Sequence, residues 1–221
     1  MFDYSLLHWT TFFVAAAALH LAPGPDMAFI LGHSVRGGRR AGFAAMGGVW
    51  VGALAHAMLA AAGLSAILAS SALAFAIVKW VGAAYLIWLG VAALRSRGAG
   101  ALGSPGAVGS LGALGRPARA ASWRIARQGV MVSLLNPKVA MFFLAFLPQF
   151  VEPGAGPAWA QLLLHGVLII FVAALIEPPL VMIAGGLSEA LRRRPSIGLW
   201  LDRTLGALLI GLGARLALQE R

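Results

Sequence analysis

Pro23-Gly24-Pro25-Asp26 interrupts a run of membrane-length apolar sequence that extends over residues 6–31. Proline removes a backbone donor and clashes with the carbonyl four residues earlier, so the helix is expected to break here. A freed carbonyl finds no water in hydrocarbon, and a broken helix persists there only where it is buried or lines a cavity. We therefore predict that this segment lines a cavity inside a membrane.

Two further motifs of this kind lie in later apolar runs. Asn136-Pro137-Lys138 interrupts residues 129–150, and Glu177-Pro178-Pro179 interrupts residues 159–186. Interrupted helices in corresponding parts of two half-chains are typical of a transporter binding site. We predict that segments 23–26, 136–138 and 177–179 depart from ideal helix. The first two are expected to face each other across a polar cavity.

The composition excludes an ordinary soluble domain. Of the 221 residues, 60% are hydrophobic and only 11% are charged, against about 45–50% and about 25% in soluble domains. A membrane-spanning helix needs about 20 apolar residues. Six runs meet this length, over residues 6–31, 42–68, 73–94, 129–150, 159–186 and 197–217. The sequence predicts an all-α integral membrane protein with six transmembrane helices, of which helices 1, 4 and 5 are broken by proline.

The order of these runs divides one membrane domain, residues 1–221, into two halves. Residues 98–115 are nearly all Gly, Ala, Ser, Leu and Pro, a composition typical of a flexible linker. We predict a first three-helix half over 1–94, a cytoplasmic linker over 95–127 and a second three-helix half over 128–221. Because each half has an odd number of spans, the two halves enter the membrane from opposite sides, as in an inverted repeat.

The net charge of +10 is unevenly distributed. Twelve of the 17 basic residues fall in three alternate loops: Arg36, Arg39, Arg40, then Arg95, Arg97, Arg116, Arg119, Arg124, Arg127, then Arg192, Arg193 and Arg194. This alternation follows the positive-inside rule. It predicts cytoplasmic loops that contact anionic lipids, both termini outside, and no nucleic-acid partner.

Several kinds of chemistry lack their residues in this chain. There is no cysteine, which excludes disulfides and cysteine-ligated metals. No glycine-rich loop with Lys-Ser/Thr is present, so ATP is not the expected energy source. The histidines lack partners at metal-ligand spacing. We predict no cofactor, no metal and no enzymatic activity.

The first break offers groups for both charges of a zwitterion. Pro23 and Pro25 free the carbonyls of Leu19 and Leu21, which suit an ammonium group or another cation. The helix that restarts at Asp26 presents backbone N–H groups that suit an anion. Asp26 has two interpretations: it caps the restarted helix, or it binds an ammonium group or a transported proton.

The other buried charges also have two interpretations each. Lys138 either snorkels to the cytoplasmic face or forms an ion pair with Asp26 or a substrate carboxylate. Glu177 is either a proton site or the ion-pair partner of Lys79, and His56 either packs or carries protons. The predicted substrate-binding residues are Pro23, Gly24, Pro25, Asp26, Asn136, Pro137 and Lys138, and the proton or ion-pair residues are Glu177, Lys79 and His56.

The chain resembles the LysE/RhtB family of amino-acid exporters. The matching segments are Leu21 to Met27, Gly37-Gly38-Arg39-Arg40-Ala41-Gly42, Lys79 to Leu86, and Asn136-Pro137-Lys138 followed by Phe142 to Phe150. They keep the family's order and spacing over most of residues 10–150, and residues 159–217 match more loosely. The resemblance implies six spans and proton-coupled efflux of amino acids or related zwitterionic metabolites from the bacterial cytoplasm. It places the chain in the inner membrane and leaves a homo-oligomer open.

Two alternatives stay open at the level of sequence. One is an exporter of inorganic cations on a related scaffold, which would favour bare carboxylates and carbonyls, so that Lys138 argues against it. The other is a non-transporting membrane module that packs with a partner. The polar residues at three helix breaks argue against that module, since packing alone does not require them.

Overall fold

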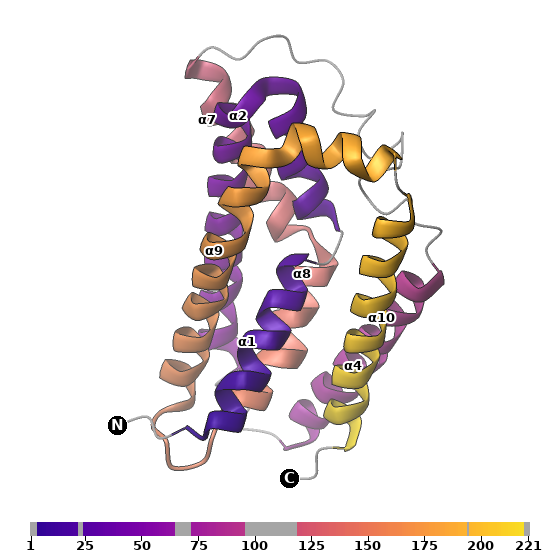
Figure 1. Cartoon of the computed structure of the whole chain (residues 1–221). Helices are drawn as coiled ribbons and strands as arrows, with labels where there is room; N and C mark the ends of the chain where they lie inside the picture. The colour runs from indigo at the N-terminus through magenta and orange to yellow at the C-terminus, as the bar shows by residue number, and fades with distance from the viewer. Residues whose placement is uncertain (1–3, 22–23, 65–71, 96–118, 194, 219–221) are drawn as a thin grey trace.

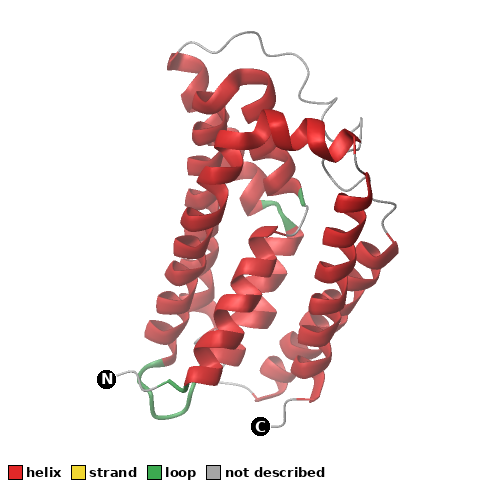
Figure 2. Cartoon of the chain, in the orientation of Figure 1, coloured by secondary structure: helices red, strands yellow, loops and turns green. Residues whose placement is uncertain are grey.

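The computed structural model describes residues 4–21, 24–64, 72–95, 119–193 and 195–218. Within these ranges every regular element is a helix, and loops are short (Figure 2). The elements are α1 (Leu6–Leu21), α2 (Pro25–Leu59), the π-helical turn η1 (Ala60–Leu64), α4 (Ala72–Arg95), α7 (Arg119–Leu134), α8 (Pro137–Met141), the π-helical turn η2 (Phe142–Phe146), the 3₁₀ turn η3 (Leu147–Phe150), α9 (Ala158–Arg193) and α10 (Pro195–Leu218). An all-helical fold is therefore confirmed.

The helices pack as two neighbouring groups. In one group α2 lies against α7 and α9, and α1 lies along α9, while in the other α4 pairs with α10 (Figure 1). The segment from α8 to η2 contacts both groups. The largest buried side chains of the first group come from α1, η2, η3 and α9, and they include Phe12, Phe146 and Leu162. This apolar core supports the residues of the candidate site described below.

Helix α2 doubles back on itself at Gly38. This glycine has φ 72° and ψ −177°, a backbone conformation that residues with side chains rarely adopt. A methyl group at Gly42 would collide with Ser34 Oγ, although eight residues of straight helix would separate the two by about 12 Å. Figure 1 shows α2 reversing at the top of the molecule. The loop expected between residues 31 and 42 is therefore a tight turn between two helical arms.

Helices α1 and α9 run parallel and in register. Three hydrogen bonds link α1, or Tyr4 just before it, to α9. In each of them the two residues are 157 positions apart in the sequence: Tyr4 with Gln161, His8 with His165, and His20 with Glu177. A constant offset of this kind requires both helices to run in the same direction. They accordingly begin at the same end of the molecule (Figure 1).

Glycines bring the main helix pairs into backbone contact. In α2, a methyl group at Gly48 would collide with the carbonyl of Ala126 in α7, and one at Gly52 would lie 2.6 Å from Ser133 Cβ. A methyl at Gly90 of α4 would lie 2.6 Å from the carbonyl of Gly206 in α10, and the reverse contact is equally short. Small residues at such spacing allow close helix approach in membranes, which fixes α2 against α7 and α4 against α10.

Two of the three expected helix breaks are present. Gly24, in extended conformation (φ −172°, ψ 178°), separates α1 from α2, and Asn136 (φ −77°, ψ 107°) separates α7 from α8. The short loop segments at these breaks are drawn in green at mid-height in Figure 2. Pro23 lies outside the described residues.

The third predicted break is wrong, because α9 continues as a helix through Pro178 and Pro179. Two prolines remove only the donors to the carbonyls four residues earlier, and the packing of α9 on α1 and α2 holds the helix together.

In the predicted linker, α7 already begins at Arg119, while residues 98–115 lie outside the described part.

In the described part of the chain, two helices are long and apolar enough to cross a membrane. They are Pro25–Leu64 and Ala158–Ala184. A third counts if Ser122–Leu134 and Pro137–Phe150, which meet at 50°, form one bent span. The shorter helices Leu6–Leu21 and Lys79–Ala92 are also apolar. A helical membrane protein is thus supported, and six spans stay a prediction.

Candidate functional site

The two helix breaks meet at the centre of the molecule. Asn136 Nδ2 donates a hydrogen bond of 2.8 Å to Asp26 Oδ1, which links the second break to the first. The side chain of Lys138 also reaches the first break, since a methyl group on Gly24 would lie 3.2 Å from Nζ and 3.3 Å from Cδ. Residues 110 positions apart therefore form one polar centre.

The second break follows from the sequence around Pro137. Asn136 caps α8, because its Oδ1 accepts a 3.0 Å hydrogen bond from the backbone N–H of Lys138. Pro137 has no N–H for the carbonyl of Ser133. That carbonyl accepts instead from the N–H of Asn136 at 3.1 Å and from His56 Nε2 at 3.2 Å. His56 thus satisfies the backbone at the break.

A pocket opens beside this centre. Its polar lining consists of His20, Asp26, Trp50, Lys138 and Glu177. Its remaining lining is apolar and consists of Leu19, Met27, Val49, Ala53, Val139, Phe143, Ile169, Ile170 and Ala173. A few convergent polar groups within apolar walls are typical of a small-molecule site.

Glu177 is held by two neighbours in this pocket. Its Oε1 lies 3.0 Å from His20 Nδ1, and its Oε2 accepts a 2.7 Å hydrogen bond from Trp50 Nε1. His20 Nε2 lies 3.1 Å from the carbonyl of Ile169. Because a carbonyl only accepts, Nε2 carries a hydrogen. A second proton must then lie between Nδ1 and Oε1, either on the imidazole or on the carboxylate.

The structure separates Lys79 from this centre. Lys79 belongs to α4, which packs against α10, and its Nζ lies 5.3 Å from the ring centroid of Trp80. The partners found for Glu177 are His20 and Trp50, so the predicted pairing with Lys79 is corrected. Pro25 is the exposed first residue of α2.

Sequence reasoning missed His20 and Trp50 as parts of the site. Both lie in apolar runs, and each resembles a common packing or interfacial residue. One signal was available for His20: it is the only ionisable residue in the last turn of α1, directly before the first break. Its pairing with Glu177 depends on the register of α1 against α9, which no local pattern reveals.

Helix breaks that meet around opposite charges inside a bundle of apolar helices define a membrane transporter. The family model described as "LysE type translocator" matches residues 17–220, and the chain belongs to this family. The family consists of transporters and not of enzymes, so both the resemblance and the expectation of a non-enzyme are confirmed.

Bacterial relatives match over almost the whole chain. A homoserine/homoserine lactone efflux protein of Salmonella typhimurium is 32% identical over 95% of both chains. A membrane protein of Vibrio cholerae is 30% identical over 95% of this chain and 96% of its own. A leucine efflux protein of Klebsiella pneumoniae is 26% identical over 97% of both. No solved structure matches the chain at a significant level.

Proposed function

We propose that this protein exports neutral amino acids, or closely related zwitterions, across the bacterial inner membrane in exchange for protons. The observation that carries the proposal is the meeting of the two helix breaks, where Asn136 bonds Asp26 and where Asp26 and Lys138 line one pocket. Relatives named for the efflux of homoserine and of leucine support an amino-acid substrate.

In this proposal the two charges of the substrate go to opposite sides of the centre. The carboxylate of Asp26 has its Oδ1 bonded to Asn136, and it binds the substrate ammonium group. The ammonium group of Lys138, close to Gly24, attracts the substrate carboxylate. Charge-assisted hydrogen bonds are about twice as strong as neutral ones, so this pair orients the substrate.

The walls of the pocket indicate the side chains that the site accepts. Apart from the five polar residues, the lining is aliphatic or aromatic, for example Val49, Phe143 and Ile170. A second full charge on the substrate would lose its hydration against such walls without compensation. The site is therefore expected to favour uncharged side chains over those of lysine or glutamate.

The contact between His20 and Glu177 is proposed as the proton site. It holds one proton beyond the fixed hydrogen on Nε2, and it joins α1 to α9. Loss of that proton leaves a lone pair on Nδ1 facing a carboxylate, so the contact between the helices is weakened. Proton uptake and release are thereby coupled to the position of α1, the helix that leads into the first break.

An inorganic-cation exporter is less compatible with these contacts. Lys138 lies in the same pocket as Asp26 and Glu177. A fixed ammonium group there repels a metal cation. An amino acid, in contrast, uses both signs of charge.

The topology proposed with this function has six spans, in two inverted halves over 1–94 and 128–221, and both termini outside. In support, α1 begins and α10 ends at one end of the molecule, whereas the turn of α2 and the start of α7 lie at the other (Figure 1). Arg36, Arg39 and Arg40 are exposed at that second end, where we expect contact with anionic lipids and cytoplasm. Reporter fusions at Gly106 and Arg221 should report opposite sides.

Transport by reconstituted protein tests the function. Proteoliposomes loaded with labelled homoserine, leucine or lysine are diluted into buffers that impose an inward proton gradient. The gradient is expected to accelerate release of the two neutral amino acids and to leave lysine release unchanged. Gradient-independent release of every amino acid would refute the proposal.

A Glu177→Gln variant separates proton coupling from substrate binding. It is expected to lose acceleration by the gradient while it still exchanges labelled for unlabelled substrate. Gln keeps the volume and can accept the hydrogen bond of Trp50, so the fold is retained. His33→Gln, on the same helix as Trp50 but outside the pocket lining, is the matched control and should behave as the parent protein. Equal acceleration in both variants would exclude the His20–Glu177 contact as the proton site.

A further inference from the structure

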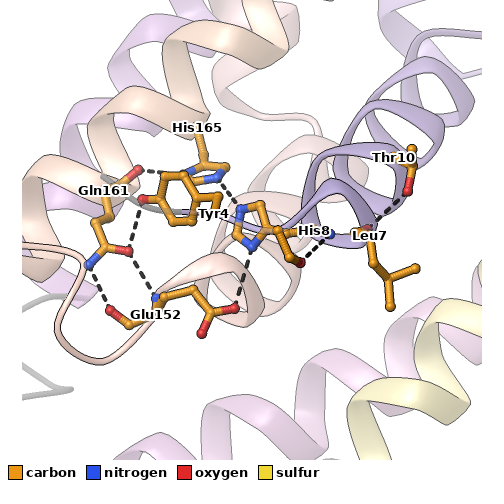
Figure 3. Close-up of polar contacts among 8 residues, drawn as sticks. Tyr4, Leu7, His8, Thr10, Glu152, Gln161 and His165 are labelled. Atoms are coloured by element: carbon orange, nitrogen blue, oxygen red, sulfur yellow. Dashed lines mark hydrogen bonds and ion pairs between the residues drawn. The ribbon is translucent and has the colours of Figure 1, made fainter. Parts of the chain in front are cut away.

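A second polar centre lies where α1 and α9 begin, apart from the pocket. It consists of Tyr4, His8, Glu152, Gln161 and His165, and is termed here the histidine cluster (Figure 3). His8, Gln161 and His165 are buried. Twelve residues of α1 separate His8 from His20, or about 18 Å along a helix, so the cluster is a separate structure.

Gln161 anchors this cluster to the segment between η3 and α9. Its Oε1 accepts from Tyr4 Oη and from the N–H of Glu152, both at 2.9 Å. Its Nε2 donates to the carbonyls of Glu152 and Gly156 at 3.0 Å and 2.8 Å. All four hydrogen-bonding positions of the amide are thus used. Burial and, secondly, the charge of Glu152 raise the pKa of Tyr4, so its hydroxyl stays a donor.

The hydrogen positions of the two histidines follow from their partners. His165 Nδ1 lies 2.8 Å from the carbonyl of Gln161, which only accepts, so Nδ1 carries a hydrogen. In neutral His165 the other nitrogen, Nε2, is then an acceptor. It lies 2.9 Å from His8 Nε2, which must be the donor. The remaining nitrogen, His8 Nδ1, faces Glu152 Oε1 at 3.5 Å.

While the hydrogen bond between His8 and His165 is intact, the two rings can take up one additional proton but not a second. A first proton goes to His8 Nδ1, where the carboxylate of Glu152 stabilises it and the bond to His165 is kept. A second proton has only His165 Nε2 left, and it replaces the hydrogen bond by two cations in contact. Within the described residues, the ionisable groups against the two rings are Tyr4 and Glu152, and the other ring neighbours are Trp9, Phe12 and Phe150.

We propose that the histidine cluster is the outer gate of the transporter and that double protonation of His8 and His165 from the external side opens it. The proposal rests on the transport function and on the topology that puts this end outside. It adds to them a second proton-sensitive site, which acts on access to the pocket and not on binding.

The packing between the cluster and the pocket explains why this contact closes the outer route. The space between the cluster and the pocket is filled by apolar side chains, including Phe12, Phe146 and Ile169, all essentially inaccessible to solvent. A substrate leaves this way only if α1 separates from α9. Among the described residues, the side-chain hydrogen bonds from α1 to α9 lie at two levels, at His8 with His165 and at His20 with Glu177 and Ile169. Tyr4, just before α1, also bonds Gln161 beside the first level. External protons that break the hydrogen bond between His8 and His165 allow α1 to move away from α9. Release of substrate is thereby coupled to the acidity outside.

The chain contains no cysteine, so a single introduced cysteine reports access to the pocket. Ala53→Cys places a thiol in the pocket lining, and Pro157→Cys places a reference thiol at an exposed position beside the cluster. Intact cells are treated with a membrane-impermeant maleimide at about pH 7.5 and about pH 5.5, which bracket the usual histidine range. The ratio of pocket to reference labelling cancels the effect of pH on the thiol itself.

In the parent background the labelling ratio is expected to rise about tenfold at the acidic pH. This rise corresponds to a loss of about 1.4 kcal/mol in the free energy that favours the closed gate. His165→Gln should hold the ratio low at both pH values, because glutamine still accepts from His8 but does not titrate. His165→Leu should raise it at both, since the acceptor is lost. His33→Gln is the histidine control and should retain the full response.

Three outcomes would overturn the gate. They are a ratio that does not change with pH in the parent background, a response that persists in His165→Gln, and a reference thiol that reacts only after permeabilisation. None of these measurements uses a substrate, so a failure to export amino acids would refute the proposed function and leave the gate result standing.

Discussion

The two helix breaks are built differently. The break at Asn136 supplies its own cap, since its side chain accepts from the backbone of Lys138. The break at Gly24 has no side-chain cap, and its residue lies in an extended conformation. Asp26, in the first turn of α2, is instead bonded by the amide of Asn136. One break is self-contained and the other depends on it.

This difference assigns separate tasks to the two motifs. Because Asn136 uses Oδ1 for its own helix and Nδ2 for Asp26, it fixes the distance between the two breaks. The uncapped N-terminus of α2 keeps its N–H groups and Asp26 available for a ligand. We infer that the second motif is mainly a support and the first mainly a binding surface, and substitutions at four positions test that division.

Asp26→Asn should have the largest effect. The Asn136 amide can still donate to the new side chain, and asparagine is well tolerated at a helix start, so expression and folding should stay near normal. Losing a charged hydrogen-bond partner of the substrate costs about 3 kcal/mol, or roughly 100-fold in transport. The measurement is initial efflux rate in proteoliposomes. Normal transport by this variant would show that Asp26 serves only to join α2 to Asn136.

Lys138→Met should have the next largest effect. Methionine keeps an unbranched side chain beside Gly24, so the helix contact survives while the charge is lost. Substrate KM should rise about tenfold with little change in maximal rate, as expected for loss of binding that is equal in ground and transition states. If KM is unchanged, Lys138 serves packing alone and the substrate carboxylate binds elsewhere.

Asn136 can be tested in its two tasks separately. Asn136→Ala removes both the cap of α8 and the donor to Asp26, and loss of the cap alone should lower the free energy of unfolding by about 1 kcal/mol. Asn136→Asp keeps an acceptor for the cap but sets a carboxylate against Asp26. Its stability should therefore recover as pH falls, because one proton then bridges the two carboxylates. Thermal unfolding in detergent between about pH 4.5 and pH 8 measures both. If the stability of both variants changed with pH in the same way, the double role of Asn136 would be contradicted.

Gly24→Ala should have the smallest effect. The extended backbone of Gly24 is open to any residue, so the only conflict is the new methyl with Lys138, 3.2 Å from Nζ and 3.3 Å from Cδ. The end of this flexible side chain can shift, and KM should rise only about two- to threefold. Gly32→Ala is the control, since nothing lies within 4 Å of its added methyl. An equal effect in both variants would remove the Lys138 contact as the cause.

The parts of the fold that depend on near neighbours were predictable from sequence. A proline acts within four residues, so Pro25 and Pro137 marked the two breaks, and the orphaned carbonyl of Ser133 could be named in advance. The same rule overestimated Pro178-Pro179, because the missing donors do not decide whether packed neighbours hold a helix together. The reversal at Gly38 looked like a loop, since sequence does not distinguish a loop from one residue with positive φ.

Contacts in the site that depend on how α1 and α9 are aligned along their lengths could not be predicted from the sequence. For Glu177 the sequence suggests either a proton site or an ion pair with Lys79, the latter from matching opposite charges at similar depth. Its partner His20 lies 157 residues away, and the contact exists because α1 and α9 run parallel at a fixed offset. The same offset joins His8 to His165. A single sequence contains no measure of that offset, so neither histidine contact could be assigned before the helices were placed.

The glycine contact between α4 and α10 also bears on how the chain is assembled during synthesis. Gly90 and Gly206 approach so closely that neither tolerates a methyl group, yet α4 ends at Arg95 and α10 begins only at Pro195. At about 5–20 residues per second, α4 waits roughly 5–20 seconds after its own completion before its partner starts to emerge. Throughout that interval its glycine face is covered by lipid or by the insertion machinery. The α4–α10 pair is therefore the last part of the molecule to form.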